Sequence, residues 1–219
     1  MKKLYIYCAG GFGKEVMDVA RRYNANKKKW SSINFLDDSS LDKIKYDANI
    51  YKFENFLATG AMLSGEVVIA NGEPAVREKL CNLLISNGAT LATLVDTSSI
   101  VAETSVIEPG VVITPLCSIS SDAILKKNSS VNTMSIVGHD VEVGENSVIS
   151  SMVNIGGASK IGRNCYIGMG ALIKESVVIG DNVIIGMGSV VYSDIPDDVI
   201  ALGNPARPMR PNTNKKVFK

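Results

Sequence analysis

The chain contains a single histidine, His139, which is followed directly by a carboxylate, Asp140. A neutral imidazole has a pKa close to physiological pH, so it can accept a proton from an attacking nucleophile without much tuning by its surroundings. His139 is therefore a candidate general base. The residue type alone leaves open the alternative that His139 is an ordinary surface histidine.

A second candidate site lies near the N-terminus, where Gly10, Gly11 and Gly13 form a glycine-rich loop after an apolar run. Backbone N–H groups at the start of a helix can bind phosphate, and Asp37, at the end of the next expected strand, is placed to meet a ribose or a base edge. The loop is not a full dinucleotide fingerprint, because Cys8 stands at the first glycine position and a second βαβαβ half is missing. The pattern favours a mononucleotide site, with a plain structural turn as the alternative.

The elements that would position this loop alternate between strand and helix, which is typical of a small parallel α/β domain. Apolar residues at helical spacing, and a proline suited to a first helical turn, predict helices over 14–23, 53–63 and 74–86. Short apolar runs predict buried strands at 4–7, 33–36 and 67–69.

From residue 95 the apolar pattern changes to a period of six, which neither a helix nor a simple strand produces. Every sixth residue from Val95 to Val191 is aliphatic, without a break in register. A chain wound around a triangular prism explains this period, with one hexad on each side and the aliphatic residue pointing into the axis. His139, two positions after inward-pointing Val137, should then lie near a corner on the outside.

Composition excludes several classes of function. The formal net charge of +1, from 23 basic and 22 acidic residues, gives no electrostatic reason to expect nucleic-acid binding. The four cysteines are scattered, and with one histidine they indicate buried thiols in a reducing compartment rather than a zinc site. No stretch approaches the length of a membrane span, and the N-terminal apolar run breaks too early for a signal peptide. We expect a cytoplasmic protein without a metal.

The hexad pattern resembles that of the hexapeptide-repeat acyltransferases, whose β-helix is left-handed. The whole chain is similar to a narrower group, the nucleotide-sugar and sialic-acid acetyltransferases, in which a short Rossmann-like domain precedes the β-helix. The segments that carry the similarity are the 5–7 strand with its glycine loop, Phe35-Leu36-Asp37-Asp38, Ile69-Ala70-Asn71-Gly72, Asn132 through Gly138-His139-Asp140, and Gly203-Asn204-Pro205-Ala206-Arg207. The similarity implies a Rossmann-like domain over 1–93, which binds the nucleotide sugar, and a left-handed parallel β-helix over 94–219.

This resemblance implies that His139 is the general base and that Asp140 orients it or raises its basicity. Three hexads make one coil in the family, so residues 18 apart stack, and Gly157 lies beside His139 on the next coil. Its N–H would stabilise the oxyanion of a tetrahedral intermediate, with a simple turn glycine as the alternative. Asn132 matches a polar position beside the family's active site, and a turn asparagine in a left-handed conformation is an equal alternative.

In the similar enzymes a sugar nucleotide is held at positions that correspond to Gly10, Gly11, Phe12, Asp37, Asp38 and Gly72. Phe12 stands where some relatives have a histidine near the sugar, so the sugar preference can differ. Acetyl-CoA lies in this family along the groove between neighbouring β-helices of a trimer, at positions that correspond to Val148, Gly157, Met169 and Met187. Many relatives have a second histidine at the position of Val148. The resemblance therefore implies acetyl-CoA as co-substrate and a homotrimer.

We therefore expect N-acetylation of a nucleotide-linked amino sugar, with a 4-amino-4,6-dideoxyhexose as the expected sugar. O-acetylation of a sialic acid or a related sugar is the alternative within the class. A non-enzymatic β-helix that binds sugar nucleotides is the alternative outside it. A zinc-dependent carbonic anhydrase on the same helix is not expected, because it needs several histidine ligands and the chain has one.

Overall fold

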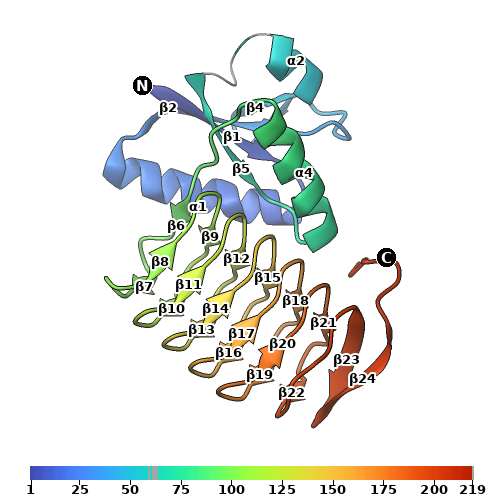
Figure 1. Ribbon diagram of the computed structural model, residues 1–219. Helices are drawn as coiled ribbons and strands as arrows, with labels where there is room; N and C mark the ends of the chain where they lie inside the picture. Colours follow the sequence, from blue (N-terminus) through green and yellow to red (C-terminus); the bar gives the residue numbers. More distant parts are fainter. Residues whose placement is uncertain (59, 61–63, 219) are drawn as a thin grey trace.

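The computed structural model describes residues 1–58, 60 and 64–218 and shows two parts (Figure 1). An N-terminal α/β part lies against one side of a β-helix, which continues to the C-terminal segment. Within this described part of the chain, no helix is long and apolar enough to cross a membrane.

The N-terminal part is a five-stranded sheet in the order β3-β4-β2-β1-β5, with helices on both faces. Its elements in chain order are β1 (Lys2–Tyr7), α1 (Gly11–Lys27), β2 (Trp30–Leu36), β3 (Ile44–Lys45), β4 (Ala48–Tyr51), α2 (Phe53–Ala58), β5 (Glu66–Ile69) and α4 (Pro74–Ser86). β1 pairs in parallel with both β2 and β5. Because α1 and α4 pack on opposite faces of this sheet, the carboxyl ends of β1 and β5 meet at the kind of crevice where open α/β sheets bind ligands.

The expected elements of this part are present, with three differences. α1 begins three residues earlier than expected, because the glycine loop itself forms the first turn, in which the Lys14 N–H donates to the Gly10 carbonyl (3.1 Å). The expected helix over 53–63 is described to Ala58, and residues 59 and 61–63 lie outside the described residues. The β3–β4 hairpin was not expected, because its strands are short and Tyr46 and Asp47 adopt positive φ without a glycine (52° and 55°).

The β-helix has three sheets whose parallel coils pair residues 18 apart, which confirms three hexads per left-handed coil. Sheet I contains β6 (Leu94–Val95), β9 (Val112–Ile113), β12 (Ser130–Val131), β15 (Val148–Ile149), β18 (Tyr166–Ile167), β21 (Ile184–Ile185), β23 (Val199–Gly203) and β24 (Ala206–Pro211). Sheet II contains β7 (Ile100–Val101), β10 (Ser118–Ile119), β13 (Ile136–Val137), β16 (Asn154–Ile155), β19 (Leu172–Ile173) and β22 (Val190–Val191). Sheet III contains β8 (Val106–Ile107), β11 (Ile124–Leu125), β14 (Glu142–Val143), β17 (Lys160–Ile161) and β20 (Val178–Ile179).

The repeated aliphatic residues fill the axis of the prism. Those from Ile113 to Val191 are buried in one continuous cluster, and those of the first coil, such as Val101, pack against it. Buried serines link successive coils: Ser135 Oγ donates to the Ser150 carbonyl (2.8 Å) and accepts from the Val153 N–H (3.1 Å). Apolar stacking and these bonds together hold the coils in register.

Tight turns form the three corners of the prism, and most of them contain a residue with φ between 55° and 69°. Corner I/II contains the turns at 114–117, 132–135, 150–153, 168–171 and 186–189. Corner II/III contains those at 120–123, 138–141, 156–159 and 174–177. Corner III/I contains those at 126–129, 144–147, 162–165 and 180–183.

The N-terminal part is fixed to sheet I and to its two corners. Leu94 and Val112 of sheet I belong to the apolar cluster under α1. Arg77 of α4 is fully buried and donates to the Asn128 carbonyl (2.9 Å from Nε) at corner III/I. These contacts leave corner II/III on the side of the prism away from the N-terminal part.

Candidate active site

His139 lies at corner II/III, between β13 and β14, with 70% of its side chain exposed. Its Nδ1 is 2.7 Å from Asp140 Oδ2. An ionised carboxylate only accepts hydrogen bonds, so this contact places the proton of the neutral imidazole on Nδ1 and leaves the Nε2 lone pair free. Asp140 has φ of 57°, a left-handed conformation that aspartate tolerates better than most residues. The pair is therefore arranged as a base and the group that orients it.

Gly157 lies directly beside His139 on the next coil. The Ala158 N–H donates to the His139 carbonyl (2.8 Å), which fixes the register between the two coils. A Cβ atom at Gly157 would lie 2.5 Å from His139 Nε2, so only glycine leaves room for the imidazole in this position. The Gly157 N–H donates to no atom of the described residues. It is therefore available to a substrate oxygen near Nε2.

Asn132 does not meet His139 within the chain. It lies at corner I/II, at the other end of the prism side that carries β13. Its Oδ1 is buried and accepts no hydrogen bond from the described residues. A buried amide oxygen without a donor is uncommon in folded proteins.

The expected cofactor positions fall into two groups. Met169 and Met187 are exposed (51% and 79%) and stack one coil apart at corner I/II. Val148 instead lies on the outer face of sheet I and is only 1% exposed. This corrects the expectation for Val148, because sheet I is the side that the N-terminal part covers and the side chain is not accessible to a cofactor.

The glycine loop forms an open helix N-terminus at the carboxyl end of β1. Gly10 is the N-cap of α1 without a side-chain cap, and side chains at Gly10 and Gly11 would meet nothing within 4 Å. The loop therefore exposes backbone N–H groups to an anion. Gly13 has a packing role, since a Cβ there would lie 2.1 Å from the Cys8 carbonyl oxygen.

The Asp37-Asp38 pair shapes this loop. Asp37 Oδ2 accepts the Ala9 N–H (2.8 Å), and its Oδ1 accepts from Ser39 and Ser40. Burial would raise the pKa of Asp37, but these hydrogen bonds outweigh it and the pKa lies below its ordinary value. Asp38 accepts from the Tyr7 hydroxyl (2.7 Å), and burial together with that bond raises the pKa of Tyr7 well above its usual range. Asp37 thus holds the loop in shape, and Asp38 bonds to the strand that leads into it.

Lys45 is a candidate binding residue that the sequence pattern did not single out. It lies on the unexpected β3–β4 hairpin, and its Nζ donates to the Ala9 carbonyl (2.8 Å), directly before Gly10 and Gly11. A cation beside an open helix N-terminus strengthens anion binding. The lysine is eight residues beyond Asp37 with no motif around it, so only the fold brings it to the loop.

Gly72 follows β5 and lies across the crevice from this loop, where the neighbouring Asn71 Nδ2 is 3.5 Å from Cys8 Sγ. Among the described residues, no group of three or more His, Cys, Asp or Glu side chains could hold a metal ion. The structure thus contains a candidate anion-binding loop on the N-terminal part and a candidate base at corner II/III, and one chain does not bring the two together.

Two family descriptions match the chain. Residues 3–84 match the PglD N-terminal domain, and residues 158–193 match the bacterial transferase hexapeptide repeat. The chain is a hexapeptide-repeat acetyltransferase. Its N-terminal part is of the PglD type, and it precedes the β-helix as the resemblance implied.

Solved structures match this acetyltransferase over nearly its whole length. The acetyltransferase domain of PglB from Neisseria gonorrhoeae FA1090 is 27% identical with a TM-score of 0.89, and the match covers 95% of this chain and 100% of that one. WeeI from Acinetobacter baumannii AYE is 29% identical with a TM-score of 0.87, and the match covers 95% of this chain and 100% of that one. PerB from Caulobacter crescentus, solved with CoA and GDP-perosamine, is 23% identical with a TM-score of 0.87 and coverages of 96% and 98%; at this identity the match shows the fold alone.

Proposed function

We propose that this acetyltransferase transfers the acetyl group of acetyl-CoA to the amino group of a nucleotide-linked amino sugar. The observation that carries the proposal is the His139–Asp140 pair, with the free Nε2 directed over Gly157. The gonococcal PglB domain has been solved with acetyl-CoA, which supports the choice of acyl donor. A 4-amino-4,6-dideoxyhexose is the expected sugar, and GDP-perosamine in the Caulobacter structure supports a nucleotide-linked one.

In the proposed reaction the amine nitrogen attacks the thioester carbonyl directly. A C–N bond forms, and the carbonyl oxygen becomes an oxyanion that accepts a hydrogen bond from the Gly157 N–H. His139 Nε2 takes the proton from the nitrogen, while Asp140 stabilises the resulting imidazolium. The C–S bond then breaks, and the proton passes to the sulfur of CoA. The amide product and free thiol account for all atoms without a metal.

The sugar nucleotide is proposed to lie in the crevice between the β1 and β5 ends. The diphosphate would accept hydrogen bonds from the N–H groups of Gly10, Gly11 and Phe12, with the charge of Lys45 beside them. The Asp37-Asp38 pair would hold the loop and border the nucleoside. Four free cysteines fit a reducing compartment, so we place the reaction in the cytoplasm.

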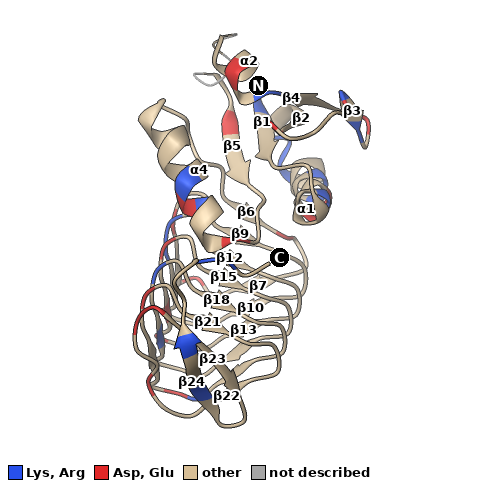
Figure 2. Ribbon diagram, turned by 90° about the vertical axis from the view of Figure 1, so that its right-hand side faces the viewer, with Lys and Arg blue, Asp and Glu red and all other residues tan. Residues whose placement is uncertain are grey.

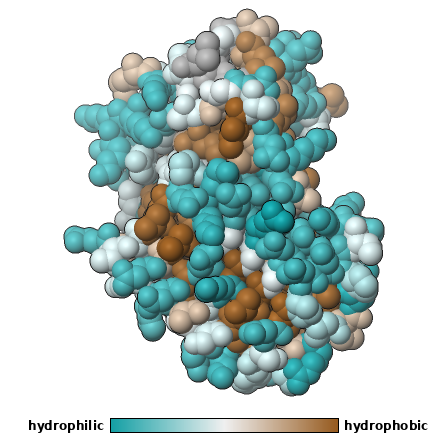
Figure 3. Space-filling view, viewed as in Figure 1, coloured by the Kyte–Doolittle hydropathy of each residue, from teal (hydrophilic) through white to brown (hydrophobic). Residues whose placement is uncertain are grey.

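A homotrimer would bring the two halves of the site together. The turns of corner I/II from 114 to 189 have no charged residue, whereas every turn of corner III/I carries one or more. Figure 2 shows charges gathered along one long edge of the β-helix. Exposed apolar side chains stack along corner I/II: Leu116, Met134, Met152, Met169 and Met187. On the face in Figure 3, by contrast, hydrophilic residues interrupt the brown patches. An uncharged apolar edge of this length favours a second copy as its cover.

The loop of one copy would then face His139 of the next. Glu15 and Asp18 of α1 line a cavity with Thr114 and Thr133 of corner I/II, so the nucleotide loop lies beside this corner. A neighbouring prism packed here would present its own corner II/III to the loop. Asn132, with its unpaired Oδ1, would lie at this junction.

The proposal is tested by a thiol-release screen with acetyl-CoA and two kinds of acceptor: UDP-, GDP- and dTDP-linked amino sugars, and a sialic acid that offers only hydroxyl groups. We expect release of CoA with at least one of the amines, and a fall in kcat of about 10²- to 10⁴-fold for His139→Ala. The acid limb of the pH–rate profile that belongs to the imidazole should disappear in this variant. If turnover occurs only with hydroxyl acceptors, the function is O-acetylation rather than N-acetylation. If no acceptor gives release of CoA, the protein binds sugar nucleotides without being an enzyme.

A further inference from the structure

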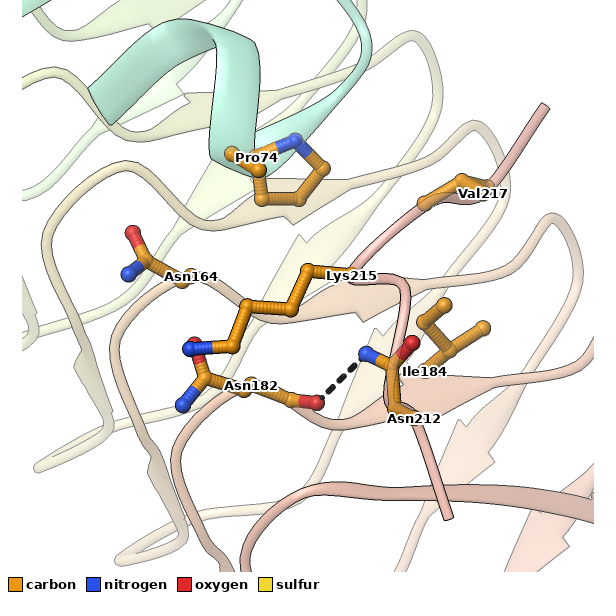
Figure 4. A pocket seen from close by; sticks show the side chains of 8 residues that line it. Pro74, Asn164, Asn182, Ile184, Asn212, Lys215 and Val217 are labelled. Carbon is orange, nitrogen blue, oxygen red and sulfur yellow. Dashed lines mark hydrogen bonds between the residues drawn. The ribbon is translucent and has the colours of Figure 1, made fainter. Parts of the chain in front are cut away.

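The C-terminal tail, residues 212–218, is packed against the β-helix rather than loose. The Asn212 N–H donates to the Asp198 carbonyl (2.7 Å), and its Nδ2 donates to the Asn182 carbonyl (2.8 Å). Figure 4 shows the Lys215 side chain lying along corner III/I, between the tail and Asn182. The cavity left there is about 10 Å³, which has room for no more than about one water molecule. The tail therefore has a defined course from the last coils back toward the N-terminal part (Figure 1).

The tail ends on a carboxylate of the N-terminal part. Glu73, the residue before α4, accepts the Val217 N–H (2.8 Å) and the Phe218 N–H (2.6 Å), one on each oxygen. Bonds to a charged acceptor are the stronger kind of hydrogen bond, so this junction fixes the last described residues. Two N–H groups on the carboxylate also offset its negative charge at the edge of the crevice.

The ring of Phe218 lies against Gly72. It packs edge-on against Tyr166 of β18, with centroids 5.6 Å apart and an 83° interplanar angle. A Cβ atom at Gly72 would be 3.2 Å from this ring, so the glycine allows the close approach. Phe218 is nevertheless 49% exposed. One side of the ring thus packs against Tyr166 and Gly72, and the other side is exposed to solvent.

Gly72 and the glycine loop border the same crevice, because Gly72 follows β5 and Cys8 follows the adjacent β1. We propose that the tail forms one wall of the sugar-nucleotide site and that the open face of Phe218 contacts the bound nucleoside. Aromatic rings stack on bases of any type, which suits a wall that supports the ligand without choosing the base. The inference rests on the proposed function, since it assumes that the crevice binds a nucleotide.

If the tail lines the sugar-nucleotide site, changes to the tail should affect the kinetics of the sugar nucleotide alone. Phe218→Ala should raise KM for the sugar nucleotide about tenfold and leave kcat and KM for acetyl-CoA unchanged, whereas Phe218→Tyr should restore wild-type KM. Deletion of residues 215–219 should have the same effect as Phe218→Ala or a larger one. Met209→Ala, which removes another exposed apolar side chain near the C-terminus, serves as the matched control.

Binding of free UDP, GDP and dTDP by calorimetry gives a readout without turnover, and Kd should weaken by the same factor. Unchanged KM and Kd in Phe218→Ala would overturn the inference. A lower KM after deletion would also overturn it, because the tail would then block the site instead of lining it. Failure of the proposed function is a different result, since the wild-type chain would then show neither turnover nor nucleotide binding.

Discussion

At the scale of single residues, the geometry around His139 depends on residue 157 being a glycine, which has no side chain. The imidazole lies in the space that any Cβ at residue 157 would occupy. Asp140 holds the other ring nitrogen, so the ring is fixed from both sides although most of it is exposed. The proposed base is therefore already oriented before a substrate binds, as proton transfer would require.

Gly157→Ala should displace this ring and reduce kcat at least tenfold, although the substitution retains the backbone N–H at this position. A displacement of about 1 Å is enough to cost on the order of 10²-fold in rate. The double variant Gly157→Ala with His139→Ala provides the control. If space for the imidazole is the reason, the glycine change has no further effect on kcat once the imidazole is gone, whereas a full additional loss would point to another role of Gly157.

Lys45→Gln should raise KM for the sugar nucleotide about tenfold, which corresponds to roughly 1.4 kcal/mol for a charged contact to phosphate. The difference from the wild type should shrink at high salt, because the lysine is partly exposed and its charge is screened. Lys43→Gln, directly before the same hairpin and exposed, controls for net charge. Equal effects of the two changes in steady-state kinetics would argue against a specific contact by Lys45.

These residues show what register alone can predict. The period of six places the aliphatic residues in the axis, and the spacing of 18 brings Gly157 to His139, because every coil repeats the same geometry. The burial of Val148 could not be predicted, since it depends on which of three equivalent faces the N-terminal part covers. Lys45 was missed for a similar reason: its position depends on a short hairpin with an unusual turn.

At the scale of elements, α4 is fixed to the β-helix by a buried cation. Burial lowers the pKa of Arg77 to about 10, so it stays charged at neutral pH, and no carboxylate of the described residues pairs with it. Carbonyl oxygens of Ile69, Asn71 and Asn128 accept its hydrogen bonds instead. Asn128 in turn donates to Asn146, which donates to Asn164, so a row of asparagines extends this junction down corner III/I.

Arg77→Lys should destabilise the protein by about 2–4 kcal/mol, although it keeps the charge. Lysine cannot reach carbonyls in several directions at once, so buried acceptors would lose their donors. Chemical denaturation of this variant measures the loss. Arg163→Lys, an exposed arginine on the same corner, is the matched control and should change stability by less than about 0.5 kcal/mol.

A second junction makes stability depend on pH. Burial would raise the pKa of Asp96, but hydrogen bonds from Ser98 and Arg22 outweigh it and hold the pKa below the ordinary 3.8. The ionised carboxylate therefore stabilises the folded state at pH values above about 4, and this contribution is lost as pH falls through the lower folded-state pKa. The stability difference between wild type and Asp96→Asn should shrink from pH 6 to pH 3 in denaturant titrations; a constant difference would contradict this.

At the scale of the whole molecule, the proposed trimer depends on the uncharged corner I/II. Replacing Met134 and Met152, each about half exposed, by glutamate would place charges in the buried interface. Sedimentation should show a trimer for the wild type at micromolar concentration and a shift to monomer for the double variant, with loss of turnover. Leu41→Glu, a change at a nearly fully exposed residue of the N-terminal part, should alter neither property.

Because the tail returns to Glu73, the number of coils in the β-helix sets the length of tail that is needed. Duplicating residues 167–184 would add one complete coil, and the fold should tolerate such an insertion because the coils around it pair residues 18 apart. The extra coil would, however, lengthen the distance between the last coils and Glu73, which the tail has to span, by roughly 4.8 Å. An extended residue spans about 3.3 Å, so about two additional tail residues would be needed to reach the same carboxylate. Coil number and tail length are therefore not independent, and natural variation in one should be accompanied by variation in the other.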